Sequence, residues 1–445
     1  MKNCAITPPD WLARAAVYQI NPRTFSKEGT IKAIEKELPF LKELGFSIMY
    51  LCPIFQADVS TNLENWSERQ KKSQTNNPKN PYRMKDYFTI DEEYGTMDDL
   101  RDFVAAAHAL DIRVILDLVY AHIGPDADIL KRRPDFAKQN ADGSTIYSAW
   151  HFPFLDFNCP GLREYLYANM VYYVGALDVD GFRCDVGDAV PLDFWVEGKK
   201  RICAVKPDAI LINEGRKGES LRAAFDSMYC FDWHSSVYNV FTGDTSASDM
   251  QNTWETVAAD LPDGSLLLRD IDNHDTVTDW PARTETAAGH EGMEQIEIIT
   301  YLMDGIPMVY CGNELGDETV MSLFANRFFP GRFSATDRSI AKEDYSLRRQ
   351  ALMKKLNELK KKSDILRYGK THFLTHSNPD QVFSFAREWE GKQMIFIGNC
   401  KNESVQVTLD TPLTGEILFQ NRCRRQGNQL TFEPYGYLVL KDEEE

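Results

Sequence analysis

The stretch GFRCDV (residues 181–186) is a short apolar run that ends at a carboxylate, Asp185. Two later stretches repeat this pattern: LINEG carries Glu214 near its end, and DIDNHD ends on Asp275. In a (β/α)8 barrel the C-terminal ends of the strands converge on one mouth, where the chemistry takes place. These three acids are therefore predicted to face one substrate, although they lie far apart in the sequence.

Outside these stretches, short apolar runs alternate with longer amphipathic segments, which is the βα pattern of a parallel sheet. The expected strands are residues 16–25, 47–55, 113–120, a run ending at Asp185, 209–215, 228–233, 265–273 and 306–312. Amphipathic segments such as 31–45, 98–110, 162–177 and 193–205 predict helices between them, and a last helix ends near residue 362. The pattern predicts an α/β protein built on a (β/α)8, or TIM, barrel.

Two regions depart from this alternation. Residues 121–160 lack helix or strand periodicity and are too long for a βα turn, so we expect a small subdomain inserted after the third strand. Beyond about residue 365, short alternating runs separated by turns predict an antiparallel β-sandwich. The expected domains are a barrel over residues 1–120 and 161–364, the inserted subdomain over 121–160, and an all-β domain over 365–445.

Composition excludes several classes of partner. The chain has 445 residues and a net charge of −17, so it lacks the basic footprint of a nucleic-acid binder. No apolar stretch reaches the roughly 18–20 residues of a membrane span. The nine cysteines are scattered and form no CxxC pair, as in a protein with reduced thiols. We expect a cytoplasmic protein with a small-molecule partner, and the sequence leaves the oligomeric state open.

Seven segments, in this order, resemble those of the α-amylase superfamily of retaining glycoside hydrolases. They are YQINPRTF, YRMKDYFTIDEEYGT (82–96), DLVYAH (117–122), GFRCDV, NEG, DNHD and GIPMVYCGNELG (305–316). The similarity runs from Val17 to Gly316 and continues into the β domain. Each segment alone is a weak signal, whereas seven in the correct order are a strong one.

The resemblance implies a role for each of the three acids. Asp185 would be the nucleophile that attacks the anomeric carbon, and Glu214 the acid that protonates the leaving oxygen and then activates water. Asp275 would bind sugar hydroxyls and stabilise the distorted, oxocarbenium-like state. Arg183 stands two residues before Asp185 on the same strand face, so it would keep that carboxylate ionised. Glu214 has only Asn and Gly as neighbours and is the better candidate for the protonated partner.

The same resemblance implies a set of supporting residues. His122 and His274 would donate hydrogen bonds to sugar hydroxyls, and Tyr82 would stack on the sugar ring. Asp117 would pair with the arginine of the fourth strand, and Asn273 would support the site. Three tryptophans in predicted mouth loops (Trp66, Trp233 and Trp280) could stack on sugars, although simple packing is the alternative for each.

The chain departs from the family pattern at three places. Ala121 stands where members with the usual calcium site carry Asn, so we expect no metal there and no cofactor, although calcium in the 121–160 insert or the loops stays open. Asp188 and Ala189 replace a Lys-His pair, which predicts a weaker grip on long polysaccharides. Arg83 replaces an Asp and could cap the pocket or bind an anionic group.

The function that follows is retaining hydrolysis of α-glucosidic bonds in short α-gluco-oligosaccharides through a covalent glycosyl-Asp intermediate. A transglycosylase, phosphorylase or sugar isomerase would use the same intermediate and stays a second interpretation. A non-catalytic carbohydrate-binding protein is a third, although such a protein would normally have lost one of the three acids. The long polar loop at residues 56–80 is expected to shape the pocket.

Overall fold

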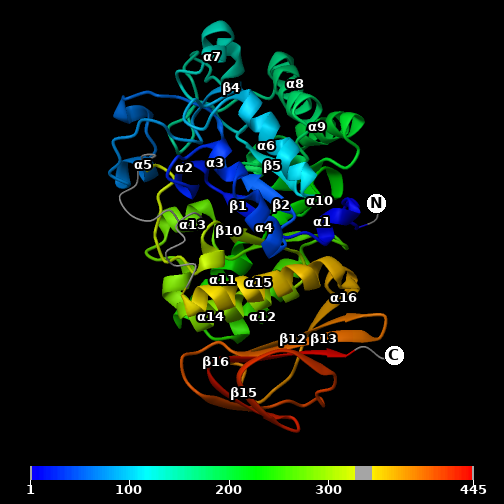
Figure 1. The fold of residues 1–445 in the computed structure, drawn as a ribbon. Helices are drawn as coiled ribbons and strands as arrows, with labels where there is room; N and C mark the ends of the chain where they lie inside the picture. Colours follow the sequence, from blue (N-terminus) through cyan, green and yellow to red (C-terminus); the bar gives the residue numbers. More distant parts are fainter. Residues whose placement is uncertain (1–2, 326–342, 443–445) are drawn as a thin grey trace.

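The computed structural model describes residues 3–325 and 343–442, and its centre is a closed barrel of eight parallel strands (Figure 1). The strands are β1 (Val17–Ile20), β2 (Ile48–Leu51), β5 (Arg113–Leu118), β6 (Gly181–Cys184), β7 (Ile210–Asn213), β8 (Ser227–Tyr229), β9 (Leu267–Asp270) and β10 (Ile306–Tyr310). They follow each other around the barrel in chain order, and β1 closes the ring against β10. The expected TIM barrel is confirmed.

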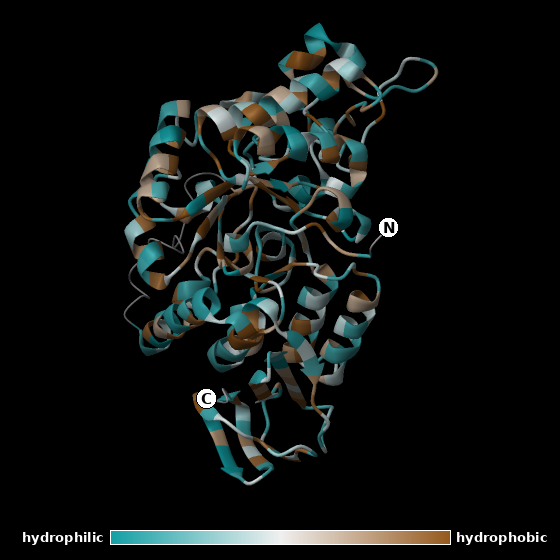
Figure 2. Ribbon diagram, turned by 90° about the vertical axis from the view of Figure 1, so that its right-hand side faces the viewer, coloured by the Kyte–Doolittle hydropathy of each residue, from teal (hydrophilic) through white to brown (hydrophobic). Residues whose placement is uncertain are grey.

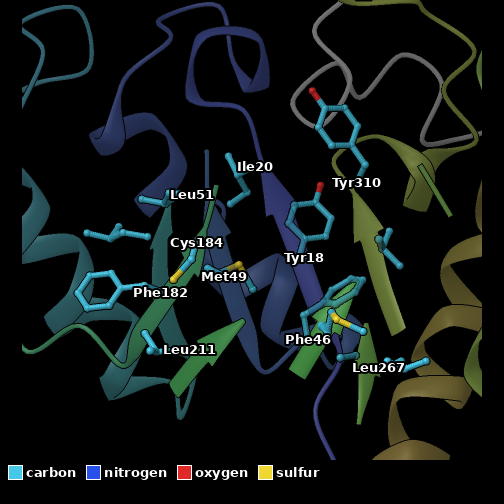
Figure 3. Close-up of a cluster of buried hydrophobic side chains, with 14 of the residues drawn as sticks. Tyr18, Ile20, Phe46, Met49, Leu51, Phe182, Cys184, Leu211, Leu267 and Tyr310 are labelled. Carbon is cyan, nitrogen blue, oxygen red and sulfur yellow. The ribbon is translucent and has the colours of Figure 1, made fainter. Parts of the chain in front are cut away.

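Side chains on the barrel strands alternate between two cores. One set, with Val17 and Ile48 among its members, forms a cluster with residues of the other strands and fills the barrel interior. The intervening residues, such as Tyr18, Met49 and Leu51, pack outward against the surrounding helices (Figure 3). Because both faces of each strand are buried, the strands read as continuous apolar runs in the sequence.

Helices surround the barrel and alternate with its strands. The longer ones are α6 (Met97–Ala109), α8 (Pro160–Ala176), α9 (Leu192–Val205), α11 (Phe231–Thr242), α12 (Ser248–Ala259), α14 (Thr284–Leu302) and α15 (Asp344–Lys362). Shorter ones are α1 (Asp10–Ala13), α2 (Pro22–Phe25), α10 (Glu219–Ala223), α13 (His274–Asp279) and α16 (Asp364–Tyr368), with 3-10 turns η3 (Gly187–Ala189) and η4 (Asn313–Leu315).

Several expected elements differ in the structure. The strand expected over residues 16–25 ends at Ile20, and Pro22–Phe25 form α2. The helix expected over residues 31–45 is two helices, α3 (Ile31–Glu35) and α4 (Leu38–Leu44), because Pro39 has no N–H to donate to the carbonyl of Glu35. The sixth strand is shorter than residues 228–233, since the chain already turns into α11 at Phe231.

The segments that follow the second and third barrel strands lie around the mouth. The first contains β3 (Phe55–Ala57), η1 (Leu63–Asn65), α5 (Glu68–Lys72) and β4 (Met84–Ile90), so the expected polar loop has a defined fold. The second contains α7 (Asp128–Arg132), η2 (Pro134–Phe136) and a series of isolated β-bridges that includes His122 with Phe154. Figures 1 and 2 show the α7 segment at the end of the molecule opposite to the C-terminal sheet.

The C-terminal domain is antiparallel, as expected. Its strands are β11 (Lys370–Phe373), β12 (Val382–Trp389), β13 (Lys392–Asn399), β14 (Val405–Thr408), β15 (Glu416–Gln426) and β16 (Gln429–Asp442). The expected sandwich of two sheets is one continuous sheet, because the long strand β16 pairs with β13, β14 and β15 together. One side encloses a separate apolar core around Phe432 and Leu440, and the other packs toward α14, where Gln295 donates to the carbonyl of Gly436.

Candidate active site

A pocket of about 480 Å³ opens at the C-terminal ends of the barrel strands. Its lining includes the three acids predicted from the sequence, Asp185, Glu214 and Asp275. Tyr82 and His122 line it as well. The structure therefore brings these five predicted residues together in one cavity.

One buried guanidinium organises the acids at the floor of the pocket. Nη1 of Arg183 contacts Asp117 Oδ1 at 2.8 Å and Asp185 Oδ1 at 3.0 Å, and Nη2 contacts Glu214 Oε2 at 2.9 Å. The expected pairing of Arg183 with Asp117 is thus present. Arg183 also contacts Asp185 as expected, and Glu214 shares the same cation.

The residue after Asp185 turns the backbone toward Glu214. Val186 has φ of 42° and ψ of 45°, a left-handed conformation that is costly for a β-branched residue. In this conformation its N–H donates to Glu214 Oε2 at 2.7 Å. Glu214 Oε2 therefore has two fixed partners, whereas Asp185 Oδ2 is buried and has no hydrogen-bond partner among the described residues.

The acids differ in how readily they hold a proton. Burial raises the pKa of Asp185 well above its ordinary value, and the nearby charge of Glu214 adds to this effect. Burial also raises the pKa of Glu214, although Arg183 opposes the shift. Burial opposes ionisation of Asp275 as well, but the positive charges of Arg69 and Arg183 outweigh it and lower its pKa. Asp185 and Glu214 therefore interact as a pair that releases its protons less readily than Asp275 does.

A chain of hydrogen bonds fixes the tautomer of His274. The side-chain oxygen Oε1 of Gln19 accepts the backbone N–H of His274. The amide Nε2 of Gln19 therefore donates to Nδ1 of the His274 ring, at 2.8 Å. The proton of the neutral ring is then on Nε2, which donates to the Tyr82 hydroxyl at 2.7 Å. That hydroxyl in turn donates to Asp117 Oδ2 at 2.9 Å. Burial lowers the pKa of His274, which agrees with a neutral ring.

These hydrogen bonds bear on the roles expected of His274 and Tyr82. Both ring nitrogens of His274 are occupied within the protein, so it positions its neighbours and is not free to donate to a sugar. Tyr82 stacks on the His274 ring with centroids 5.5 Å apart, while its side chain also lines the pocket. Tyr82 is therefore held in place before any ligand arrives.

His122 lines the pocket and has one ring nitrogen without a partner among the described residues. Its Nε2 donates to the backbone carbonyl of Tyr82 at 3.0 Å, and its ring packs against Trp150 and Phe152. Burial lowers the pKa of His122 to about 4, so the ring is neutral near pH 7. Nδ1 is then a buried lone pair without a partner in the described structure. His122 is suited to accept a hydrogen bond from a hydroxyl, whereas the sequence predicted a donor.

Asn273 fixes the position of Asp275. It caps α13, and its side-chain oxygen accepts the N–H groups of Asp275 and Thr276. Its amide donates to Asp270 Oδ2 at 2.6 Å, which anchors the cap to the end of β9. The cap therefore determines where the carboxylate of Asp275 lies.

Sequence reasoning missed several residues of the pocket, among them Arg69, Trp150 and Phe324. They come from α5, from the inserted segment and from the loop after β10. The expectation that the 56–80 loop shapes the pocket pointed to this region but not to Arg69. Nothing in the sequence distinguished Trp150 or Phe324 from other aromatic residues. The tryptophans that were considered (Trp66, Trp233 and Trp280) are absent from the pocket lining in the described structure.

Arg83 is a structural residue. It is fully buried, and its Nη atoms donate to four backbone carbonyls of the 56–80 loop, those of Asp58, Ser60, Asn65 and Pro78. The expectation that it caps the pocket or binds an anion is therefore wrong. Its guanidinium stabilises the conformation of the loop at residues 56–80 through these hydrogen bonds.

Replacing Arg83 with Met is expected to destabilise the protein by about 3 kcal/mol or more. The reason is that several buried carbonyls lose their donor, at a cost of about 1–3 kcal/mol for each buried polar group left unpaired. Thermal unfolding measures the loss, with the exposed Lys72→Met on α5 as the control. An Arg83→Met variant as stable as the control would contradict this role.

Ala121 stands where family members with calcium carry Asn, and its side chain has no oxygen to bind a metal. Ala121 is buried and offers only its carbonyl oxygen, which accepts the N–H of Leu155. In residues 3–325 and 343–442, no three His, Cys, Asp or Glu side chains are grouped to hold an ion.

No helix in the described part of the chain combines the length and apolar character that a membrane crossing requires.

Known proteins resemble this chain in sequence and in fold. Residues 19–153 match the family model for the α-amylase catalytic domain. The cyclomaltodextrinase of Thermoanaerobacter pseudethanolicus is 24% identical over 97% of this chain and 78% of its own length. The intracellular maltogenic amylase of Bacillus subtilis is 23% identical over 90% of this chain and 71% of its own. The crystal structure of a maltogenic α-amylase from Thermotoga neapolitana superposes with a TM-score of 0.81 at 23% identity, covering 98% of this chain and 100% of that one.

The structural match agrees with the barrel. Residues 19–153 are thus similar to the α-amylase catalytic domain, and the whole chain shares the fold of solved α-amylases.

Proposed function

We propose that this enzyme is a retaining hydrolase of α-glucosidic bonds in short α-gluco-oligosaccharides, acting through a covalent intermediate on Asp185. The observation that carries the proposal is the arrangement around Arg183. One guanidinium holds one oxygen each of Asp185 and Glu214, and the second oxygen of Asp185 has no partner. A retaining mechanism needs such a close pair of carboxyl groups, one as nucleophile and one as proton donor.

The reaction proceeds in two displacements. Asp185 Oδ2 attacks the anomeric carbon as the glycosidic bond breaks, and Glu214 transfers its proton to the departing oxygen. Glu214, now ionised, removes a proton from water, whose oxygen attacks the same carbon and releases Asp185. The ionised Asp275 stabilises the positive charge that develops on the sugar ring in both transition states.

The environment of the leaving group supports short substrates. Asp188 accepts the N–H groups of Arg216 and Lys217 and the amide of Asn213, so its carboxylate is used within the protein. The neighbouring Ala189 has no polar side chain. The names of the relatives, cyclomaltodextrinase and maltogenic amylase, fit substrates of the malto-oligosaccharide class.

We also propose a cellular location for the enzyme. We place the enzyme in the cytoplasm, where its nine free cysteines stay reduced. One of its relatives carries the name intracellular maltogenic amylase. The acidic charge of the chain supports a neutral sugar as partner and not a nucleic acid.

Removing divalent metal is expected to leave activity unchanged. The side chain of Ala121 carries no oxygen, whereas calcium requires several oxygen ligands. Activity and thermal unfolding are measured after EDTA treatment and again with added calcium. A fall in either quantity that calcium restores would contradict a calcium-independent fold and site.

Analysis of the first products tests the function. Purified enzyme is incubated with maltotriose, isomaltose, panose, sucrose and trehalose, with and without phosphate, and the anomer is followed by NMR before mutarotation. Glucose or maltose released first as the α-anomer supports retaining hydrolysis. Longer or rearranged sugars, or sugar phosphates, would support a transferase, phosphorylase or isomerase in its place.

A further inference from the structure

One arginine connects α5 with α13 across the edge of the pocket. Nη2 of Arg69 contacts Asp275 Oδ1 at 2.7 Å, and Nε contacts Asp279 at 2.9 Å. Phe324 lies beneath the guanidinium, with its ring centre 5.6 Å away. Arg69, Asp275 and Phe324 all line the pocket. Three separate segments of the chain thus meet at this edge.

The bridge leaves hydrogen-bonding groups of two pocket-lining residues without a partner among the described residues. Nη1 of Arg69 has no hydrogen bond to the described residues, and only Oδ1 of Asp275 is used by the arginine. Asp275 Oδ2 lies near His274 Nε2 at 3.5 Å, which is longer than a hydrogen bond. A donor and an acceptor therefore lie side by side, which is the pattern that binds neighbouring hydroxyls of a sugar ring.

Stability alone does not account for this arginine. Its side chain is 31% exposed, and those of Asp275 and Asp279 are 35% and 45% exposed. Ion pairs at such exposed positions contribute little to folding. The contacts of Arg69 are also on the Asp275 side of the pocket, and within the described residues it makes no hydrogen bond or ion pair to Glu214, which faces the leaving group.

We propose that Arg69 determines specificity by closing the pocket beyond the sugar ring that Asp185 attacks. The proposal rests on the proposed function and deepens it. In this proposal Nη1 donates to a hydroxyl of that ring, and the bridge from α5 to α13 blocks a further ring on this side. The enzyme therefore acts on the non-reducing terminal glucosyl residue and requires that end to be free.

End-blocked substrates test this directly. The wild-type enzyme is given p-nitrophenyl α-glucoside, p-nitrophenyl α-maltoside and a p-nitrophenyl malto-oligosaccharide whose non-reducing end carries a 4,6-O-ethylidene group. We expect turnover of the first two and very little of the third. Arg69→Ala is expected to lose about 10- to 100-fold in kcat/KM on the glucoside, since a hydrogen bond from a charged donor is removed. It is expected to gain turnover of the blocked substrate.

Two variants separate specificity from structure. Lys72→Ala removes one positive charge from the exposed face of the same short helix and is expected to behave as wild type. Asp279→Asn weakens the outer anchor of Arg69 without touching a sugar, and it is expected to relax the requirement for a free end only in part. Blocked and free substrates cleaved equally well by the wild type would overturn the proposal while leaving hydrolysis itself intact.

A binding measurement keeps the two proposals distinct. In the Asp185→Asn background, calorimetry compares maltotriose with its end-blocked derivative, so no turnover is needed. We expect the blocked sugar to bind at least about tenfold more weakly, and Arg69→Ala to remove the difference. Equal binding of both sugars would overturn the role of Arg69. If the difference is present but the active enzyme hydrolyses nothing, the proposed function is the one that fails.

Discussion

Replacing Asp185 with Asn is expected to lower kcat on α-gluco-oligosaccharides by on the order of 10⁵- to 10⁶-fold, as losing the nucleophile does in other enzymes that use covalent catalysis. The amide has a similar size but cannot form the glycosyl ester. The fold should survive, because Arg183 keeps its contacts with Asp117 and Glu214. Initial rates and thermal unfolding are measured side by side, with Asp193→Asn on the exposed surface of α9 as the control.

A small external nucleophile identifies the step that is lost. In Asp185→Ala, azide can enter the space of the missing carboxylate and attack the anomeric carbon from the same face. The bond to an activated leaving group then breaks in a single displacement, so the product is a β-glucosyl azide. Recovery of this product by NMR supports the nucleophile role. Full residual activity in a pure variant, or an azide product of α configuration, would contradict it.

The barrel was predictable because its information is local. A strand buried on both faces gives an apolar run, and a helix that covers the barrel gives an amphipathic segment, so both can be recognised without knowing what they contact. The errors came where one residue decides the local backbone. Pro39 divides the expected helix at residues 31–45, and Phe231 already belongs to α11 where a strand was expected.

The acids of the site were predictable for a similar reason, since each stands where its strand ends. Their environment was not. Sequence placed Arg183 beside Asp185, but only the barrel brings Glu214 to the same guanidinium. Arg83 looked like a binding group because it is charged and lies in a mouth segment, yet it is buried under the loop that it holds. Arg69 carried no signal, because its partner Asp275 lies 206 positions along the chain.

Replacing Glu214 with Gln is expected to affect substrates according to their leaving group. With maltotriose, the departing oxygen needs a proton, so kcat/KM should fall by about 10²- to 10⁴-fold, the usual contribution of a positioned acid. With glucosyl fluoride the leaving group departs without a proton, so the first step should be nearly unchanged. The second step still lacks its base, and the glycosyl-enzyme should accumulate as a burst that mass spectrometry detects on Asp185. An equal loss on both substrates would contradict the acid role.

The pH profile follows from the same residue. Burial raises the pKa of Glu214, so the protonated form that donates to the leaving oxygen persists to higher pH than in an ordinary glutamic acid. Activity of the wild type on maltotriose should therefore decline on the alkaline side as the Asp185–Glu214 pair loses its last proton. Glutamine has no proton to lose there, so the alkaline decline should disappear in Glu214→Gln. If instead the decline remained in the variant, another group would have to supply the proton, and the sharing of Arg183 between the two acids would serve only to hold the floor of the pocket together.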